Sequence, residues 1–146
     1  GCMRVIPGTH RGDVMDHEDH YDVNNLLTRG QEISAPLDEA NARHMPLRAG
    51  EMSIHNYRLA HASDANNGPD RRIGISMHFL PPNTEQIVGS WDSAALVRGQ
   101  DSFGNFELTP IPGSDLDLDA VAFHGRATLA IRDVLYADAA KNTQKL

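Results

Sequence analysis

The chain has 146 residues, enough for one domain of ordinary size, and a net charge of −7 that is spread along the sequence. An acidic chain without a basic block is a poor partner for nucleic acid or for an anionic membrane surface, so neither is expected. The single cysteine, Cys2, permits no internal disulfide and fits a reducing, cytoplasmic setting. No apolar run reaches the roughly 18 residues of a membrane span.

The first half of the sequence predicts short strands separated by polar segments. Residues 3–6 form a strand that ends at a Pro-Gly turn signal. Residues 10–31 are polar and are predicted to form a long loop, with a turn of helix near 24–27. Residues 42–48 and 51–57 are predicted to be two further strands.

The second half predicts one clear strand and then a helix. Residues 73–80 alternate apolar and polar side chains and end at Pro81-Pro82, which is typical of a half-buried strand. Residues 100–116 are rich in Gly, Pro and Asp and indicate a loop. A helix is expected over about 117–139, with Asp117 or Asp119 as its cap. Its apolar residues recur at helical spacing: Ala120, Phe123, Ala127, Ala130, Ile131, Val134 and Leu135.

Short strands with turn signals favour an antiparallel, mainly β fold, and a double-stranded β-helix (jelly roll, cupin-like) with a C-terminal helix satisfies this pattern. Such a barrel holds a ligand in its mouth. Alternation places His61 and Ser63 on one face, shared with His55 if the strand continues without a bulge, while Arg72 shares its parity with Ser76. Polar faces of this kind are costly in a dry core and are better suited to lining a site.

Arg72 follows His61 by eleven positions, and each residue adjoins a predicted strand. A neutral imidazole is a good ligand for iron. A guanidinium binds a carboxylate through two parallel hydrogen bonds. Together they make half of an iron and 2-oxoglutarate site, although a surface or structural histidine and an exposed arginine remain the alternatives for these two residues.

Several motifs resemble the phytanoyl-CoA dioxygenase family, in the same order and over about residues 1–110. They are Gly1-Cys2-Met3-Arg4-Val5-Ile6-Pro7-Gly8-Thr9-His10, Gly50-Glu51-Met52-Ser53-Ile54-His55, Leu59-Ala60-His61-Ala62-Ser63 and Arg71-Arg72-Ile73-Gly74.

The resemblance implies a non-heme Fe(II)/2-oxoglutarate-dependent dioxygenase that hydroxylates a small-molecule or acyl substrate. It makes His61 a metal ligand and catalytic residue, and it places Arg72 and Ser63 on the cosubstrate carboxylate. His55 and Ser76 are candidates for second-shell or substrate-side positions. A homo-oligomer is left open.

The family also uses a His-x-Asp pair upstream of the Gly-Cys segment, which here starts at residue 1. We therefore expect residues 1–146 to be the C-terminal part of a single jelly-roll domain, active only if those ligands are supplied. A halogenase of the same family and a non-catalytic jelly-roll binding protein are the alternatives. The substrate cannot be read from the sequence.

A second group of metal-ligand side chains, His10, Asp13, His17 and His20, fits no closed zinc pattern. Exposed charged runs of this kind are usually solvated loops, and this is the interpretation adopted for residues 10–31.

Overall fold

The computed structural model describes residues 1–21, 29–137 and 139 of the chain. It divides into two compact units, Gly1–Ile75 and Ser76–Leu146. The helical turn predicted near residues 24–27 lies outside the described residues.

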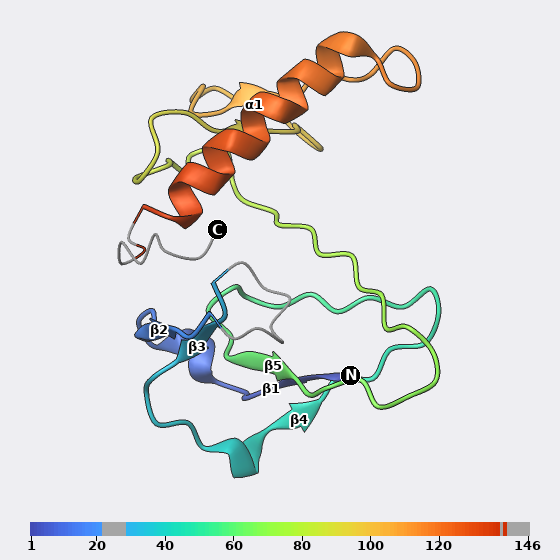
Figure 1. Ribbon diagram of the computed structural model, residues 1–146. Coiled ribbons are helices and arrows are strands. Elements are labelled where there is room, and N and C mark those ends of the chain that lie inside the picture. The colour runs from blue at the N-terminus through green and yellow to red at the C-terminus, as the bar shows by residue number, and fades with distance from the viewer. Residues whose placement is uncertain (22–28, 138, 140–146) are drawn as a thin grey trace. The chain divides into compact units, whose positions relative to one another are not determined.

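The first unit is built on a three-stranded antiparallel sheet (Figure 1). Strand β1 (Met3–Val5) lies between β4 (Arg43–His44) and β5 (His61–Ser63). The strand predicted at the start of the chain is thus confirmed, whereas only two residues of the predicted strand 42–48 pair as a strand. Val5 and Ala60, at 5% and 4% exposure, are the only buried apolar residues in the described part of the chain.

A side-chain hydroxyl extends the pairing of β1 with β5 beyond the ladder. The chain turns at Gly8, whose φ of 90° favours glycine, and enters the short 3-10 helix η1 (Thr9–Arg11). From there the Thr9 hydroxyl donates to the Ile6 carbonyl at 2.8 Å and accepts from the Ala60 N–H at 2.9 Å. The Ile6 N–H in turn donates to the Ala60 carbonyl at 3.0 Å. These bonds satisfy the backbone on both sides of the corner.

The loop predicted over residues 10–31 contains a strand instead. Strand β2 (His17–Asp19) pairs antiparallel with β3 (Gln31–Ile33). Both strands are short and largely polar, so they carry none of the apolar alternation by which a strand is recognised in a sequence. A second 3-10 helix, η2 (Glu39–Asn41), precedes β4.

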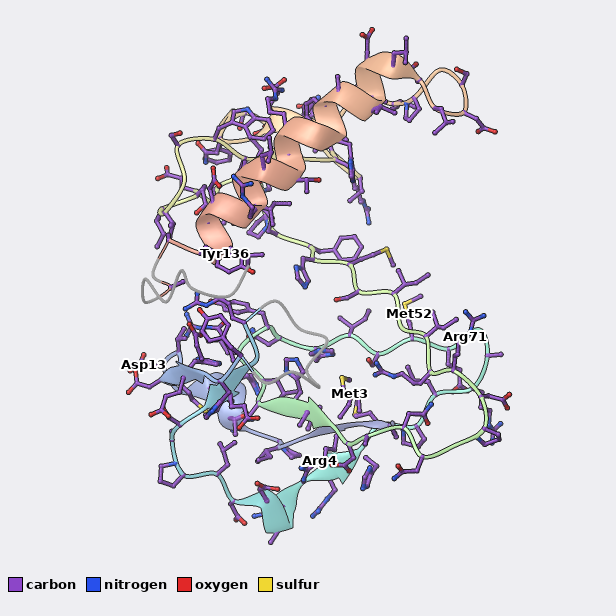
Figure 2. The ribbon with its side chains drawn as sticks, viewed as in Figure 1. Met3, Arg4, Asp13, Met52, Arg71 and Tyr136 are labelled. Atoms are coloured by element: carbon purple, nitrogen blue, oxygen red, sulfur yellow. The ribbon has the colours of Figure 1, made fainter. Side chains whose placement is uncertain are left out.

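Two predicted strands do not form in the described residues. Residues 51–57 and 73–80 are neither helix nor paired strand. Their apolar side chains stand in solvent: Ile54 is 91% exposed, Ile75 86% and Met52 74% (Met52 is labelled in Figure 2). Alternation sets the two faces of a segment, but a strand also requires a neighbour for its backbone groups, and the structure supplies none here.

The second unit contains the predicted helix as α1 (Leu118–Leu135). Asp117 caps it, with its carboxylate accepting from the N–H groups of Asp119 at 3.0 Å and Ala120 at 3.2 Å. The helix ends at Leu135, four residues before the predicted end. One face is half-buried at the predicted helical spacing, and it comprises Ala120, Phe123, Ala127, Ala130 and Val134.

An aromatic and charged cluster joins α1 to the segment before it. The Trp91 ring meets Phe123 edge-on with centroids 5.9 Å apart, and the Arg126 guanidinium lies 4.4 Å from the centroid of the Trp91 ring. The carboxylate of Glu107 accepts from the Trp91 indole at 2.8 Å and from Arg126 at 2.5 Å. These hydrogen bonds, first that from Trp91 and then that from Arg126, hold the pKa of Glu107 below its usual range.

Glu107 belongs to a small parallel pair, β6 (Ser93–Ala94) with β7 (Glu107–Leu108), within the segment that faces α1. Strand β7 lies inside the loop predicted over 100–116. Close packing is required nearby, because a Cβ atom added at Gly89 would lie 2.9 Å from a methyl group of Val134.

The described chain is therefore a set of short strands with one C-terminal helix, as predicted. It contains no closed barrel in its described part. None of its described helices has the length and apolarity to cross a membrane.

We predict that Thr9→Val destabilises the first unit by about 1–3 kcal/mol, because the isosteric methyl leaves the Ala60 N–H without its acceptor. Thr9→Ser keeps the hydroxyl and should stay close to the parent. Urea unfolding followed by circular dichroism measures both. Equal stability of the valine and serine variants would contradict the role given to the hydroxyl.

We also predict that acid loosens the cluster around Trp91. Since folding lowers the pKa of Glu107, its contribution to stability is complete above the ordinary glutamate pKa of about 4.3 and is lost as pH falls through the folded value. Trp91 is the only tryptophan, so its fluorescence should change over that window. Glu107→Gln should remove this pH dependence, and an identical acid transition in the variant would assign it elsewhere.

Candidate metal and cosubstrate site

The His61 imidazole is held by its own backbone. His61 lies on β5 opposite Val5 of β1, and its Nδ1 atom lies 2.8 Å from the carbonyl oxygen of Leu59. A carbonyl can only accept, so Nδ1 carries the hydrogen and Nε2 keeps a free lone pair. Metal-binding histidines are commonly oriented by such a bond from the second ring nitrogen. The exposed His61 ring therefore presents Nε2 as a ready ligand atom.

Ser63 lies on the same face of β5 as His61. The register pairs Ser63 with Met3 and His61 with Val5, and residues two apart in a strand share a face. The shared face predicted from alternation is confirmed for these two residues. Figure 2 labels Met3 and Arg4, which are consecutive in β1 and so lie on opposite faces of the sheet.

The opposite face of this sheet is charged. Arg4 donates to Glu39 at 2.9 Å and lies 3.6 Å from Asp64, which directly follows β5. The hydrogen bond to Glu39 and the charge of Asp64 raise the pKa of Arg4. This pairing ties the end of β5 to the central strand without using the face that carries His61.

A tight turn brings His55 beside His61. The Asn56 side-chain oxygen accepts from the Arg58 N–H at 2.9 Å, and the Asn56 carbonyl accepts from the Leu59 N–H at 3.0 Å. The two imidazole rings lie with their centroids 5.8 Å apart and tilted by 56°. Alternation predicts a shared face for His55 and His61 only in a continuous strand, whereas the structure joins them through a turn.

No hydrogen bond, ion pair or ring contact of the described residues joins Arg72 to this pair of rings. Arg72 is exposed, and its guanidinium lies near Gly74 in the same segment. Within the described residues neither Arg72 nor Arg71 (labelled in Figure 2) has a carboxylate partner. Ser76 belongs to the second unit, where its hydroxyl lies 3.5 Å from the ring of His78. The roles given to Arg72, Ser63 and Ser76 stay predictions.

The His10, Asp13, His17 and His20 group is not gathered into a metal site. Across the described residues, no group of three or more His, Cys, Asp or Glu side chains could hold a metal ion. His20 lies 3.7 Å from Glu32 on the neighbouring strand.

Sequence reasoning missed the half-buried pair of Asp19 and Arg29 near β2. The two side chains meet at 2.6 Å with 15% and 14% of their surfaces exposed. The hydrogen bond from Arg29 lowers the pKa of Asp19. His17-Glu18-Asp19 has the spacing of a His-x-Asp motif, but this carboxylate already has a cationic partner. The sequence could have indicated the ion pair of Asp19 and Arg29 only if the pairing of the two short polar strands β2 and β3 had been known.

A cleft of the first unit is separate from the predicted site residues. It has a volume of about 540 Å³, and neither His61 nor Arg72 lines it. Its walls are Ile6, Pro7, Gly8, Thr9, Met15, Pro36, Leu37, Asp38, Asn41 and Arg43.

Comparison with known proteins places the first unit in a family. The model of the phytanoyl-CoA dioxygenase (PhyH) family matches residues 1–74, which is nearly the whole of that unit. The peroxisomal phytanoyl-CoA dioxygenase of Bos taurus is 31% identical over 90 residues, which cover 60% of this chain. The match spans about a quarter (26%) of the bovine protein. No solved structure matches.

The family model covers half of the chain, and it includes β1, the Thr9 corner, the turn at Asn56 and the strand that carries His61. The chain belongs to the phytanoyl-CoA dioxygenase family.

Proposed function

We propose that this chain contributes to an Fe(II)/2-oxoglutarate-dependent dioxygenase, and that His61 is one of its iron ligands. The observation that carries the proposal is the orientation of the His61 ring, whose Nδ1–H is bound to Leu59 and whose Nε2 is left available. Family membership supports the class of reaction. Imidazole nitrogen is a suitable ligand for iron in the facial sites of such oxygenases.

The described residues fit one part of this centre. They provide the oriented imidazole, but no group of three ligands among them could hold the metal. In the proposal, the remaining histidine and carboxylate come from the His-x-Asp segment of the family pattern. Iron held by these ligands would activate dioxygen: one of its oxygen atoms would go into succinate as 2-oxoglutarate is oxidised with release of carbon dioxide, and the other would be inserted into a substrate C–H bond.

Arg72 and Ser63 are proposed to bind the distal carboxylate of 2-oxoglutarate. Arg72 has no carboxylate partner among the described residues, so its planar fork is available to an incoming dicarboxylate. Ser63 follows His61 by two positions on one face of β5, which puts a hydroxyl beside the proposed metal ligand. Both contacts would hold the cosubstrate in the site. The small-molecule or acyl substrate that is hydroxylated is left undefined.

A jelly roll is the proposed architecture of the complete catalytic domain. The antiparallel sheet of β4, β1 and β5 is compatible with it. The exposed alternating segments 51–57 and 73–80 would become strands if neighbours paired with their backbones. Their apolar side chains would then be covered rather than left in water.

We predict that His61→Ala in the intact protein abolishes stoichiometric Fe(II) binding and the turnover of 2-oxoglutarate. The substitution removes a ligand from an exposed position, so circular dichroism should show the fold unchanged. Iron content and succinate formation are the measurements. A variant that retains both would exclude His61 as a ligand.

We predict that Arg72→Lys raises the KM for 2-oxoglutarate roughly tenfold to a hundredfold. Lysine keeps the charge but loses the bidentate contact, and hydrogen bonds to charged groups contribute about 1.5–3 kcal/mol. Arg71→Lys is the matched control and should change KM little, because adjacent residues of an extended chain point to opposite sides. The reverse result would move the clamp to Arg71.

A further inference from the structure

We propose that helix α1 packs antiparallel against the same helix of a second copy of this chain, through an exposed apolar stripe centred on Gly125. This exposed stripe consists of Leu118, Val121, Ala122, Gly125 and Leu129. It lies in the second unit, outside the residues that the family model matches. Association through this stripe is therefore independent of the dioxygenase function.

Helix α1 is apolar on two opposite sides. At about 100° per residue, the five positions of the exposed stripe fall within an arc of about 100°, and the half-buried face is centred about 180° away from them. Leu118 is 84% exposed, Val121 51% and Leu129 53%. A helix that packs against a single neighbour needs one apolar stripe of this width, so the second stripe indicates a second neighbour.

Gly125 lies in the middle of the exposed stripe, where the chain itself supplies no reason for a glycine. Glycine is less favourable than alanine in the interior of a helix. A Cβ atom added at Gly125 would meet no described atom within 4 Å, whereas one added at Gly89 would meet Val134 on the half-buried face. Because the side chains at the contact set the distance between two packed helices, a glycine here would let a second helix approach closely.

A two-fold axis at Gly125 makes the exposed stripe complementary to itself. In an antiparallel pair, residues that lie equally far from the axis on either side face each other across the two copies. Val121 precedes Gly125 by four residues and Leu129 follows it by four, which is close to one helical turn in each direction. Val121 of each copy would therefore pack against Leu129 of the other, on both sides of the close contact at Gly125.

The charges at the two ends of α1 favour the antiparallel orientation. The hydrogen bonds from backbone N–H groups, first that of Gly113, lower the pKa of Asp117, so the start of the helix carries a negative charge, and Arg132 lies in its last turn. An antiparallel pair brings Arg132 of each copy to the acidic start of the other, whereas a parallel pair sets like charges side by side. The Arg132 bond to Asp133 is an exposed ion pair, which contributes little and can be exchanged.

Sedimentation equilibrium of the full chain, in reducing buffer that keeps Cys2 from linking two copies, tests the association. A contact through one helix per copy is a small interface, so the expected dimer dissociates on dilution. Leu129→Lys should raise the dissociation constant at least tenfold, because it puts a charge into both apolar contacts. Ile131→Lys is the matched control: Ile131 is also 53% exposed but points about 160° away around the helix, so the constant should be unchanged.

A bulky side chain at the axis separates loss of the dimer from loss of the fold. Gly125→Leu should raise the dissociation constant at least tenfold, because the two helices can no longer approach closely. The melting temperature of the dilute variant should not fall, since the new side chain meets open space and leucine favours a helix. A chain that stays monomeric at all concentrations, or a Gly125→Leu variant that dimerises as the parent does, would overturn the proposal.

Cross-linking tests the orientation of the two helices. In a Cys2→Ser background, chains carrying Val121→Cys are mixed with chains carrying Leu129→Cys and treated with a short bis-maleimide. The antiparallel pair predicts efficient links in the mixture and few in either variant alone, because positions 121 and 129 lie about 12 Å apart along one helix. Efficient links within each variant alone would indicate a parallel pair, and equal links in all three samples would indicate random collision. Either result would overturn the proposal.

Discussion

The first unit depends on the two hydrogen bonds that the Thr9 hydroxyl makes. The hydroxyl bridges the Ile6 carbonyl and the Ala60 N–H, and so continues the pairing of β1 with β5 past the end of the ladder. Val5 and Ala60 are the only buried apolar residues in the described part of the chain, so apolar packing contributes only a small share of the stability of the first unit. Because hydrogen bonds fix direction more sharply than apolar contact does, a unit with so small a core can still hold the backbone of His61 in place.

Local signals in the sequence predicted the helix well. Asp117 caps α1 with its own side chain, and the half-buried face repeats at the spacing of one helical turn. Both features lie within a few residues of each other in the chain. The predicted end at residue 139 was four residues too late, since no strong stop signal marks Leu135 in the sequence.

Strand predictions succeeded or failed according to whether a partner strand existed. Residues 73–80 show the clearest alternation in the chain, yet Ile75 is 86% exposed and its segment pairs with nothing in the described residues. By contrast, β2 carries no apolar pattern and forms because β3 lies beside it. Alternation is a property of one segment, whereas a strand is a property of two, so the sequence of either alone cannot decide it.

The candidate site shows the same limit at the scale of single side chains. The shared face of His61 and Ser63 follows from alternation within three residues, and the register confirms it. A shared face of His55 and His61 was predicted only for a continuous strand. The sequence did not predict that the two rings lie close together, because the turn at Asn56 brings them there. Arg72 lies in an exposed segment that pairs with no strand in the described residues, and neither alternation nor motif order indicates this.

Family membership and local geometry therefore constrain different parts of the chemistry. The family match ends at residue 74, close to the limit of the first unit, so the chemistry it implies concerns that unit and leaves the cluster of Trp91, Glu107 and Arg126 outside. Within the matched region, the bond from His61 to Leu59 fixes which nitrogen faces outward. That choice of tautomer depends on His61 and Leu59 alone, so local geometry sets it without any contribution from distant parts of the fold.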